Sequence, residues 1–376
     1  MDFEFSDDQL DLRDNARRVL AAECPPSVVR SVYEGDDTAP QADLWAALVR
    51  LDWPAIGITE EHGGMGLGFL EVGIVVEELG RVAAPSPFLA TVTQLMPLLS
   101  SAGAAEHLTR IADGSLTGTL AVGEHGRWDL AAVDTTARRA GTGWVLDGAK
   151  THVLDGATAP EVAVVARLDG TSGIDGLGAF LVPSEAIAAT PCTVMDPTMP
   201  LATLALDSVE VATDRVLLEP GDPRSPDALE RAIHGATTAM ALSTVATCRA
   251  IFETTLQYAK DREQFGRPIG SFQALKHRLA DMYLAVERAS SLAYFAALTI
   301  AEDDERRAVA SSMAKSAAGD CQRLVVGDGL QLHGGIGFTW ENDLHFLLKR
   351  AKSGDLLFGT AAFHRARLAT LLGLTP

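Results

Sequence analysis

The chain has 376 residues, of which 47% are hydrophobic and 22% charged, a composition typical of a globular protein with large cores in two or three domains. Its 50 Asp and Glu against 31 Lys and Arg give a formal net charge of -19, which repels a phosphate backbone and disfavours nucleic acid as a partner. The four cysteines form no CxxC pair and no apolar run reaches the roughly 18 residues of a membrane span, so we expect a soluble, cytoplasmic protein with no metal site and no membrane span.

The first third of the chain, residues 1–114, is predicted to be an all-α domain because its apolar residues recur at helical spacing. From about Ser115 the pattern changes to short alternating runs, such as Val162 to Val165, separated by Gly, Pro and Asp. Residues 115–222 are therefore predicted to be a β domain.

The remainder, residues 223–376, is predicted to be helical. Three long helical stretches cover roughly 227–260, 271–301 and 305–330, and a shorter helix after Gly359 would complete a bundle. The second stretch carries an apolar stripe at three-to-four spacing that we expect to be buried. Its members are Phe272, Leu275, Leu279, Met282, Val286, Ala289 and Leu292.

Two motifs lie at the ends of these helices. Asp261 to Gln273 reads DREQFGRPIGSFQ, in which an Arg, Gln donors and an aromatic ring are able to grip a pyrophosphate and stack on a base. A capped helix hairpin with a surface Arg explains the same residues equally well. Gln331 to Phe338 reads QLHGGIGF, and its paired glycines either let a backbone approach a ligand closely or simply stop a helix.

Taken together, in this order and spacing, the two motifs resemble the acyl-CoA dehydrogenase family, flavoproteins that desaturate acyl thioesters. Glu60 to Gly68, Glu77 to Arg81 and Leu146 to Lys150 resemble further stretches of the family, so the likeness covers nearly the whole chain. The resemblance implies an α+β fold with an all-α N-terminal domain, a middle β-barrel or sandwich domain and a C-terminal four-helix bundle. It also implies a dimer or a dimer of dimers.

The resemblance implies an FAD cofactor that lies across a subunit boundary. In this family the C-terminal helices of one chain hold the adenylate end, and the middle domain of the other chain holds the flavin ring. The residues that match adenylate-end positions are Arg262, Phe265, Gln273, Gln331, Gly334 and Gly335. Thr360 matches a further FAD contact, so this half of the cofactor site is predicted to be intact.

The family's reaction needs a carboxylate that removes the α-proton of the thioester, in a pocket where desolvation raises the carboxyl pKa toward neutrality. In the commonest family pattern this Glu precedes the Gly-Thr pair, and the same position here is Phe358. A second family pattern places it on the first long bundle helix, where this chain has Ala236. Glu230 remains as a candidate for a displaced base. We interpret His333 and His364 as structural.

The half of the site that would hold the flavin ring is altered. Where the family has a Thr-Glu-Pro-Gly loop, this chain reads Val122 to Asp129, and where a Trp-Ile-Thr strand touches flavin N5 it reads His152-Val153-Leu154. Leu154 cannot donate the hydroxyl hydrogen bond that Thr provides. The Arg expected to contact CoA is Thr237. The retained residues therefore fall on one side of the FAD boundary and the replaced residues on the other.

This asymmetry predicts a subunit of a heteromeric α2β2 acyl-CoA dehydrogenase that supports FAD binding but lacks the catalytic base and depends on a paralogous chain. It resembles the base-lacking subunit of actinobacterial steroid-type enzymes, which implies an acyl-CoA substrate of fatty acid or steroid degradation and an electron-transfer flavoprotein as acceptor. Three alternatives stay open: a homomeric acyl-CoA dehydrogenase with a displaced base, a flavin-dependent monooxygenase on the same fold, and a non-enzymatic scaffold.

Overall fold

The computed structural model describes residues 4–35 and 39–374. Packing divides the chain into two compact units, the first formed by Met1–Pro40, Phe69–Pro85 and Thr237–Pro376 and the second by Gln41–Gly68 and Ser86–Ala236. The predicted helical segment 1–114 contributes to both units, and the boundaries placed at residues 114 and 222 stay predictions.

Three helices supply the N-terminal part of the first unit: α1 (Asp7–Glu23), α2 (Pro26–Glu34) and α4 (Phe69–Arg81). α1 begins with a capping box, in which Ser6 and Gln9 each accept a hydrogen bond from the backbone N–H of the other. The Arg17 guanidinium joins α1 to α4 by donating hydrogen bonds of 3.0 and 2.6 Å to the two carboxylate oxygens of Glu78. Because Glu78 is buried, this forked pair fixes how the two helices align.

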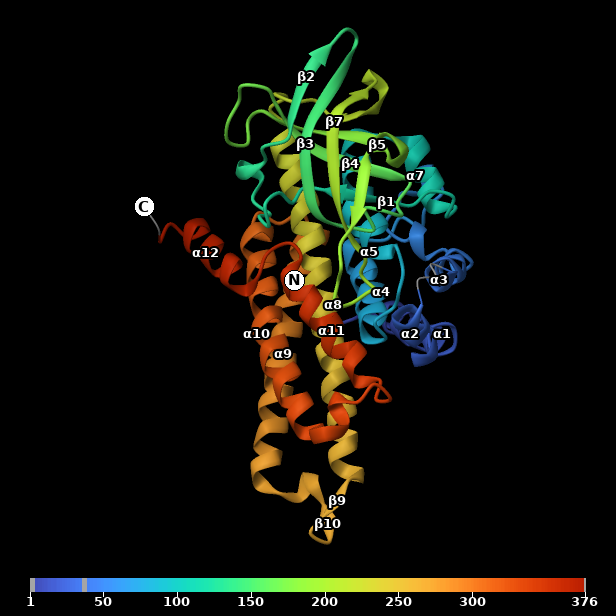
Figure 1. Ribbon diagram of the computed structural model, residues 1–376, viewed down its shortest axis with the longest axis vertical. Coiled ribbons are helices and arrows are strands. Elements are labelled where there is room, and N and C mark those ends of the chain that lie inside the picture. Colours follow the sequence, from blue (N-terminus) through green and yellow to red (C-terminus); the bar gives the residue numbers. More distant parts are fainter. Residues whose placement is uncertain (1–3, 36–38, 375–376) are drawn as a thin grey trace. The chain divides into compact units, whose positions relative to one another are not determined.

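The C-terminal part of this unit contains α8 (Ser225–Asp261, in this unit from Thr237), α9 (Gln273–Ala301), α10 (Arg307–His333), α11 (Leu344–Leu356) and α12 (Ala361–Leu371). Two short strands between α8 and α9, β9 (Glu263–Gln264) and β10 (Arg267–Pro268), pair as a hairpin. Figure 1 shows this hairpin beyond the ends of α8 and α9. The three long helices match the predicted stretches to within a few residues at each end.

The structure differs from the sequence expectation at α11, which the apolar pattern does not predict. Its last turn contains Ser353, Gly354 and Asp355, all weak helix formers, and the apolar run that follows ends this helix rather than starting another element. The predicted stripe on α9 is buried at its centre, from Leu279 to Ala289, and half-buried toward both ends.

Helix α9 is long and apolar enough to cross a membrane by length and composition, and 39% of its most apolar window is buried inside the protein. It is the one helix of the described ranges, 4–35 and 39–374, that meets this criterion. α9 packs along α10, and the core helix of a bundle has the same composition.

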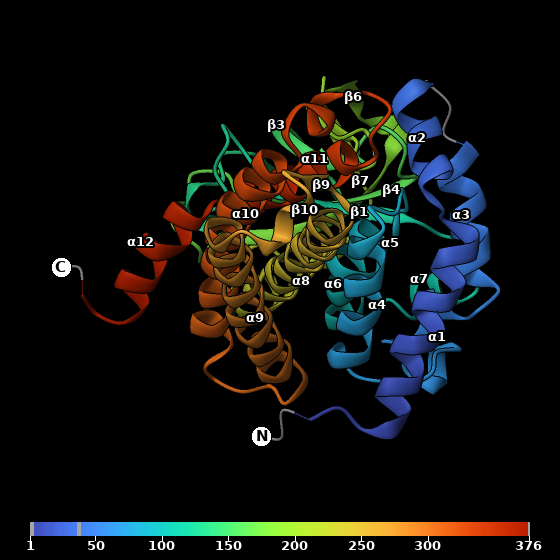
Figure 2. The same ribbon diagram turned by 90° about the horizontal axis from the view of Figure 1, so that it is seen from below.

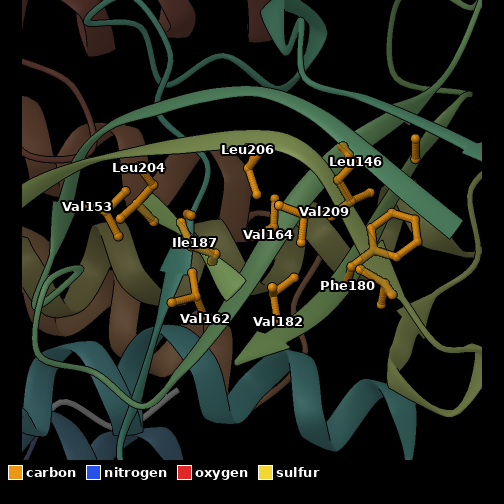
Figure 3. Close-up of a cluster of buried hydrophobic side chains, with 14 of the residues drawn as sticks. Leu146, Val153, Val162, Val164, Phe180, Val182, Ile187, Leu204, Leu206 and Val209 are labelled. Carbon is orange, nitrogen blue, oxygen red and sulfur yellow. The ribbon is translucent and has the colours of Figure 1, made fainter. Parts of the chain in front are cut away.

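The second unit contains α3 (Ala39–Val49), α5 (Phe88–Ala90), α6 (Met96–Ala102), α7 (Ala105–Ala112) and eight strands. The strands are β1 (Gly118–Ala121), β2 (Thr136–Ala140), β3 (Gly143–Leu154), β4 (Glu161–Leu168), β5 (Leu177–Pro183), β6 (Ala188–Pro191), β7 (Leu201–Val211) and β8 (Val216–Leu218). They form one sheet in the order β6-β7-β3-β2-β4-β5-β8, with β1 paired to β4. Figure 3 shows apolar side chains of β3 and β7 meeting those of β4 and β5, which closes the core of the predicted β domain.

A buried ion pair ties the loop after β1 to this sheet. The ammonium of Lys150 on β3, which is fully buried, lies 2.5 Å from Oε1 of Glu124, and Glu124 also accepts hydrogen bonds from the backbone N–H groups of Asp134 and Thr135. Burial lowers the pKa of Lys150 to about 8, against the opposing attraction of Glu124. Burial alone would raise the pKa of Glu124, but the charge of Lys150 and the hydrogen bonds outweigh it and lower that pKa.

The approach of α4 to α8 in the first unit generates the first prediction. A Cβ atom at Gly80 would lie 2.6 Å from the carbonyl oxygen of Ser243, so Gly80→Ala is expected to lower the free energy of unfolding by about 1–3 kcal/mol. Gly327→Ala on α10 is the matched control, because nothing lies within 4 Å of the added atom, and it is expected to stabilise by about 0.5–1 kcal/mol. Denaturant unfolding that finds both variants equally stable would contradict the close contact.

The buried ion pair generates the second prediction. Lys150→Met leaves the Glu124 carboxylate buried without its cation, so the free energy of unfolding is expected to fall by about 3–5 kcal/mol. Adding Glu124→Gln removes the stranded charge and should restore part of the loss, which denaturant titration of the single and double variants measures. Equal stability of the Lys150→Met single variant and the wild type would show that the pair is not a structural anchor.

Candidate functional site

The hairpin between α8 and α9 carries the first predicted FAD motif. Phe265 and Gly266 both have positive φ angles, 55° and 75°, and form the two-residue turn that joins β9 to β10. The Phe265 ring is 91% exposed at the tip of this turn, as a ring that stacks on a ligand or a second chain would be. Arg262 at the base of the hairpin is also exposed and has no ion-pair partner among the described residues.

The second motif lies at the same end of the bundle. The Tyr258 ring near the end of α8 stacks on His333 of α10 with ring centroids 4.4 Å apart, and Arg278 near the start of α9 donates a 2.8 Å hydrogen bond to Asp328 of α10. Figure 2, viewed from the end that carries β9 and β10, shows α8 and α9 running back from that hairpin. The structure thus brings six predicted positions to one end: Arg262, Phe265, Gln273, Gln331, Gly334 and Gly335.

The glycine pair makes this end open. Gly334 has a φ of 62° where α10 stops, and no atom lies within 4 Å of a Cβ built on either Gly334 or Gly335. The exposed amides of Gln273 and Gln331 lie on the helix ends that flank the pair. An unpaired guanidinium, amide donors, an exposed ring and an open backbone in an acidic protein suit a nucleotide with a pyrophosphate.

Thr360 does not lie at this end. It caps α12 by accepting a hydrogen bond from the backbone N–H of Phe363, and the turn it belongs to contacts Lys315 of α10. Gln331 is 16 residues further along α10 than Lys315, roughly 24 Å at the helical rise. Thr360 therefore stays a predicted contact to a different part of the cofactor, or to a second FAD.

The structure places the candidate base positions as follows. Phe358 is 3% exposed with a φ of 57°, and Ala236 is buried inside α8. Glu230 is half-buried on α8 and engaged with neighbouring groups. His364 is buried, and its Nε2 donates a 2.8 Å hydrogen bond to the Phe358 carbonyl. Nδ1 of His333 donates a hydrogen bond to the Gly329 carbonyl. Both histidines therefore bind backbone carbonyl groups.

The loop after β1, where the sequence analysis finds the family's Thr-Glu-Pro-Gly residues replaced, forms a tight turn. Glu124 and Arg127 pair across a tight turn at His125 and Gly126, which have φ angles of 49° and 72°. A Cβ at Gly123 would lie 2.9 Å from the Thr151 carbonyl oxygen and 3.3 Å from the Trp128 ring. The β3 backbone at Thr151, with the indole beside it, therefore leaves no room for a larger side chain at position 123. The sequence analysis identifies the replaced residues but does not predict this close packing of the loop on β3.

Side-chain ligand atoms of Glu124, His125 and Asp134 lie within 4.8 Å of one another, a grouping that the sequence analysis does not predict. The ammonium of Lys150 and three donors from residues 134 and 135 already occupy the Glu124 carboxylate. A buried cation beside this carboxylate disfavours a metal ion, so we assign no metal to the group.

Residues 6–119 match the acyl-CoA dehydrogenase N-terminal domain and residues 227–372 match the acyl-CoA dehydrogenase C-terminal domain. Acyl-CoA dehydrogenase IpdE2 of Mycobacterium tuberculosis is 32% identical over 342 residues, which cover 90% of this chain and 89% of that protein.

Two solved structures share the fold along the full length. The ChsE4-ChsE5 complex from Mycobacterium tuberculosis contains a chain that is 26% identical with a TM-score of 0.89, and the match covers 100% of both chains. The steroid ACAD Tcur3481-Tcur3483 is 29% identical with a TM-score of 0.84, and the match covers 98% of both chains. The predicted α+β fold of helical, sheet and helical parts is confirmed, and this chain belongs to the acyl-CoA dehydrogenase family of flavoprotein oxidoreductases of lipid metabolism.

Proposed function

We propose that this chain is the subunit of an α2β2 acyl-CoA dehydrogenase that grips the adenylate end of FAD and leaves removal of the substrate α-proton to a paralogous chain. The observation that carries the proposal is Phe358, whose ring cannot accept a proton and which precedes the Gly359-Thr360 pair where the family's commonest pattern has a glutamate. Ala236 at the second family position cannot accept a proton either.

The residues at the hairpin end of the bundle fit the adenylate part of FAD. Arg262 would pair with the pyrophosphate, Gln273 and Gln331 would donate amide hydrogen bonds, and the open backbone at Gly334 would accept close approach of the nucleotide. When bound, FAD would supply the acceptor for the β-hydride of the thioester.

The sheet unit supports the same division of roles. Leu154 stands where the family strand has a Thr, and its side chain has no hydroxyl group to donate to the ring. A flavin ring would lose that hydrogen bond here, and the loop from Val122 to Asp129 lacks the family's Thr-Glu-Pro-Gly residues. We therefore assign the ring to the partner's sheet domain, with the adenylate end reaching this chain.

The names of the relatives support a substrate class and a partner. The ChsE4-ChsE5 structure is of a complex, and the other neighbour is named as a steroid ACAD, so we propose an acyl-CoA of steroid or lipid breakdown and a paralogous partner. We propose an electron-transfer flavoprotein as the acceptor because the family resemblance implies one. A structure described as an electron transferring flavoprotein of Acidaminococcus fermentans shares this fold, with 27% identity and a TM-score of 0.89. All four cysteines are free thiols, which suits the reducing cytoplasm that we propose as its compartment.

The third prediction concerns flavin content. Co-expression with a paralogue from the same gene neighbourhood is expected to give a yellow complex with about one FAD per two chains, because only one kind of chain offers a ring pocket. Absorbance at the flavin band against total protein measures the ratio. Turnover by this chain alone, as a homomer, at the rate of the complex would refute the division of roles.

In that complex, Arg262→Met is expected to weaken FAD retention about tenfold to hundredfold, because it removes a charged hydrogen bond to phosphate. Arg323→Met, which changes an exposed arginine on α10 away from the hairpin, is the control and should retain the wild-type flavin content. Dialysis followed by flavin fluorescence of the released fraction provides the comparison. Equal retention by both variants would remove Arg262 from the cofactor site.

The fifth prediction separates the proposal from a displaced base on this chain. Glu230→Gln keeps the shape of the side chain and removes its ability to take a proton, and we expect turnover of the complex to stay within about twofold of wild type. A loss of about 100-fold with FAD still bound is what removal of a general base produces, and that result would favour the homomeric alternative.

A further inference from the structure

The turn between α11 and α12 has an unusual backbone. It comprises Leu357 to Thr360, and Phe358 and Gly359 have φ angles of 57° and 99°. A left-handed conformation disfavours a bulky residue such as Phe, so surrounding contacts must hold it in place. The same turn carries the position of the family's base and the predicted FAD contact Thr360.

A fully buried lysine holds this turn from α10. Nζ of Lys315 donates hydrogen bonds of 2.8 Å to the carbonyl oxygens of Asp355, in the last turn of α11, and of Gly359. The last carbonyls of a helix have no partner within the helix and carry partial negative charge, so a cation there is favourable. No carboxylate among the described residues forms an ion pair with this ammonium, so the backbone carbonyls are its hydrogen-bond partners.

The protonation state of Lys315 does not remove these contacts. Burial lowers the pKa of Lys315 to about 7, with the charge of Asp355 opposing the shift. The neutral amine keeps two N–H donors, one for each of the two carbonyls. The lysine therefore bonds both carbonyls on either side of neutral pH.

A histidine holds the turn from the other side. His364 on α12 is 3% exposed, and its Nε2 donates to the Phe358 carbonyl at 2.8 Å. Gly319 allows α10 to lie close to the end of α11, because a Cβ atom at this position would overlap the Asp355 carboxylate. Three carbonyls in five residues are thus bonded by two buried side chains from two helices.

We propose that Lys315 and His364 are positioning residues that fix the α11–α12 turn and thereby present Thr360 to the flavin and keep Phe358 buried. The part that concerns Thr360 and FAD rests on the proposed function. The fixing of the turn rests only on the hydrogen bonds and burial described above.

The test uses the complex with its paralogue and compares four variants of this chain. Lys315→Met keeps the length of the side chain and removes its donors, and Arg323→Met, at an exposed cation on the same helix that does not contact the turn, is its control. His364→Ala removes the second donor, and His364→Gln restores an N–H that reaches the same carbonyl.

Hydrogen exchange of the peptide that spans residues 355–362 is expected to become about tenfold faster in Lys315→Met and His364→Ala, and to stay near wild type in Arg323→Met and His364→Gln. Flavin retention is expected to fall in the first pair only. If Lys315→Met does not fold, the two His364 variants decide the question alone.

Unchanged exchange in His364→Ala would overturn the positioning role. Faster exchange with flavin fully retained would leave the positioning role standing and would overturn the contact between Thr360 and FAD. Wild-type exchange in His364→Gln, with slow flavin release, is the combination that supports both parts, because a general packing defect would not be rescued by restoring one donor.

Discussion

The attraction between one buried ammonium group and the carbonyl end of a short helix organises the C-terminal part of the first unit. Lys315 lies in the first third of α10, and α9, α11 and α12 all pack on that helix. Without a donor at this point, the carbonyls of Asp355 and Gly359 would be buried and unpaired, which is a large cost in a protein interior. The turn that holds Phe358 and Thr360 can therefore lie inside the protein, although its backbone departs from helix geometry.

The second unit contains a buried ammonium with a different partner. Lys150 contacts a carboxylate, Glu124, and that carboxylate also accepts backbone N–H groups from residues 134 and 135. The pair keeps the loop after β1 attached to the sheet. Under the proposed division of roles, this support persists while the groups that would touch a flavin are replaced, so scaffold and chemistry would be separable in this chain.

The periodicity of apolar residues predicts the long helices α8, α9 and α10 well, because each presents a stripe to its neighbours over seven turns or more. The apolar pattern does not predict α11, since Gly354 lies in its last turn. The stability of this helix comes from packing on α10 and from the hydrogen bond of Lys315 rather than from the helix propensity of its residues. The gathering of the two FAD motifs at one end follows from their places at helix termini. The role of His364 cannot be predicted in the same way, because it depends on the left-handed backbone at Phe358, which the sequence does not display.

The close packing around Gly123 limits which residues this position can hold. A Cβ atom there would lie 2.9 Å from the backbone carbonyl oxygen of Thr151 on β3, closer than the 3.3 Å to the Trp128 ring. Removing the indole alone would therefore leave a hole without making room for a larger residue. A side chain at position 123 requires the loop to move away from β3, and the ion pair between Glu124 and Lys150 opposes that movement from the next residue of the loop.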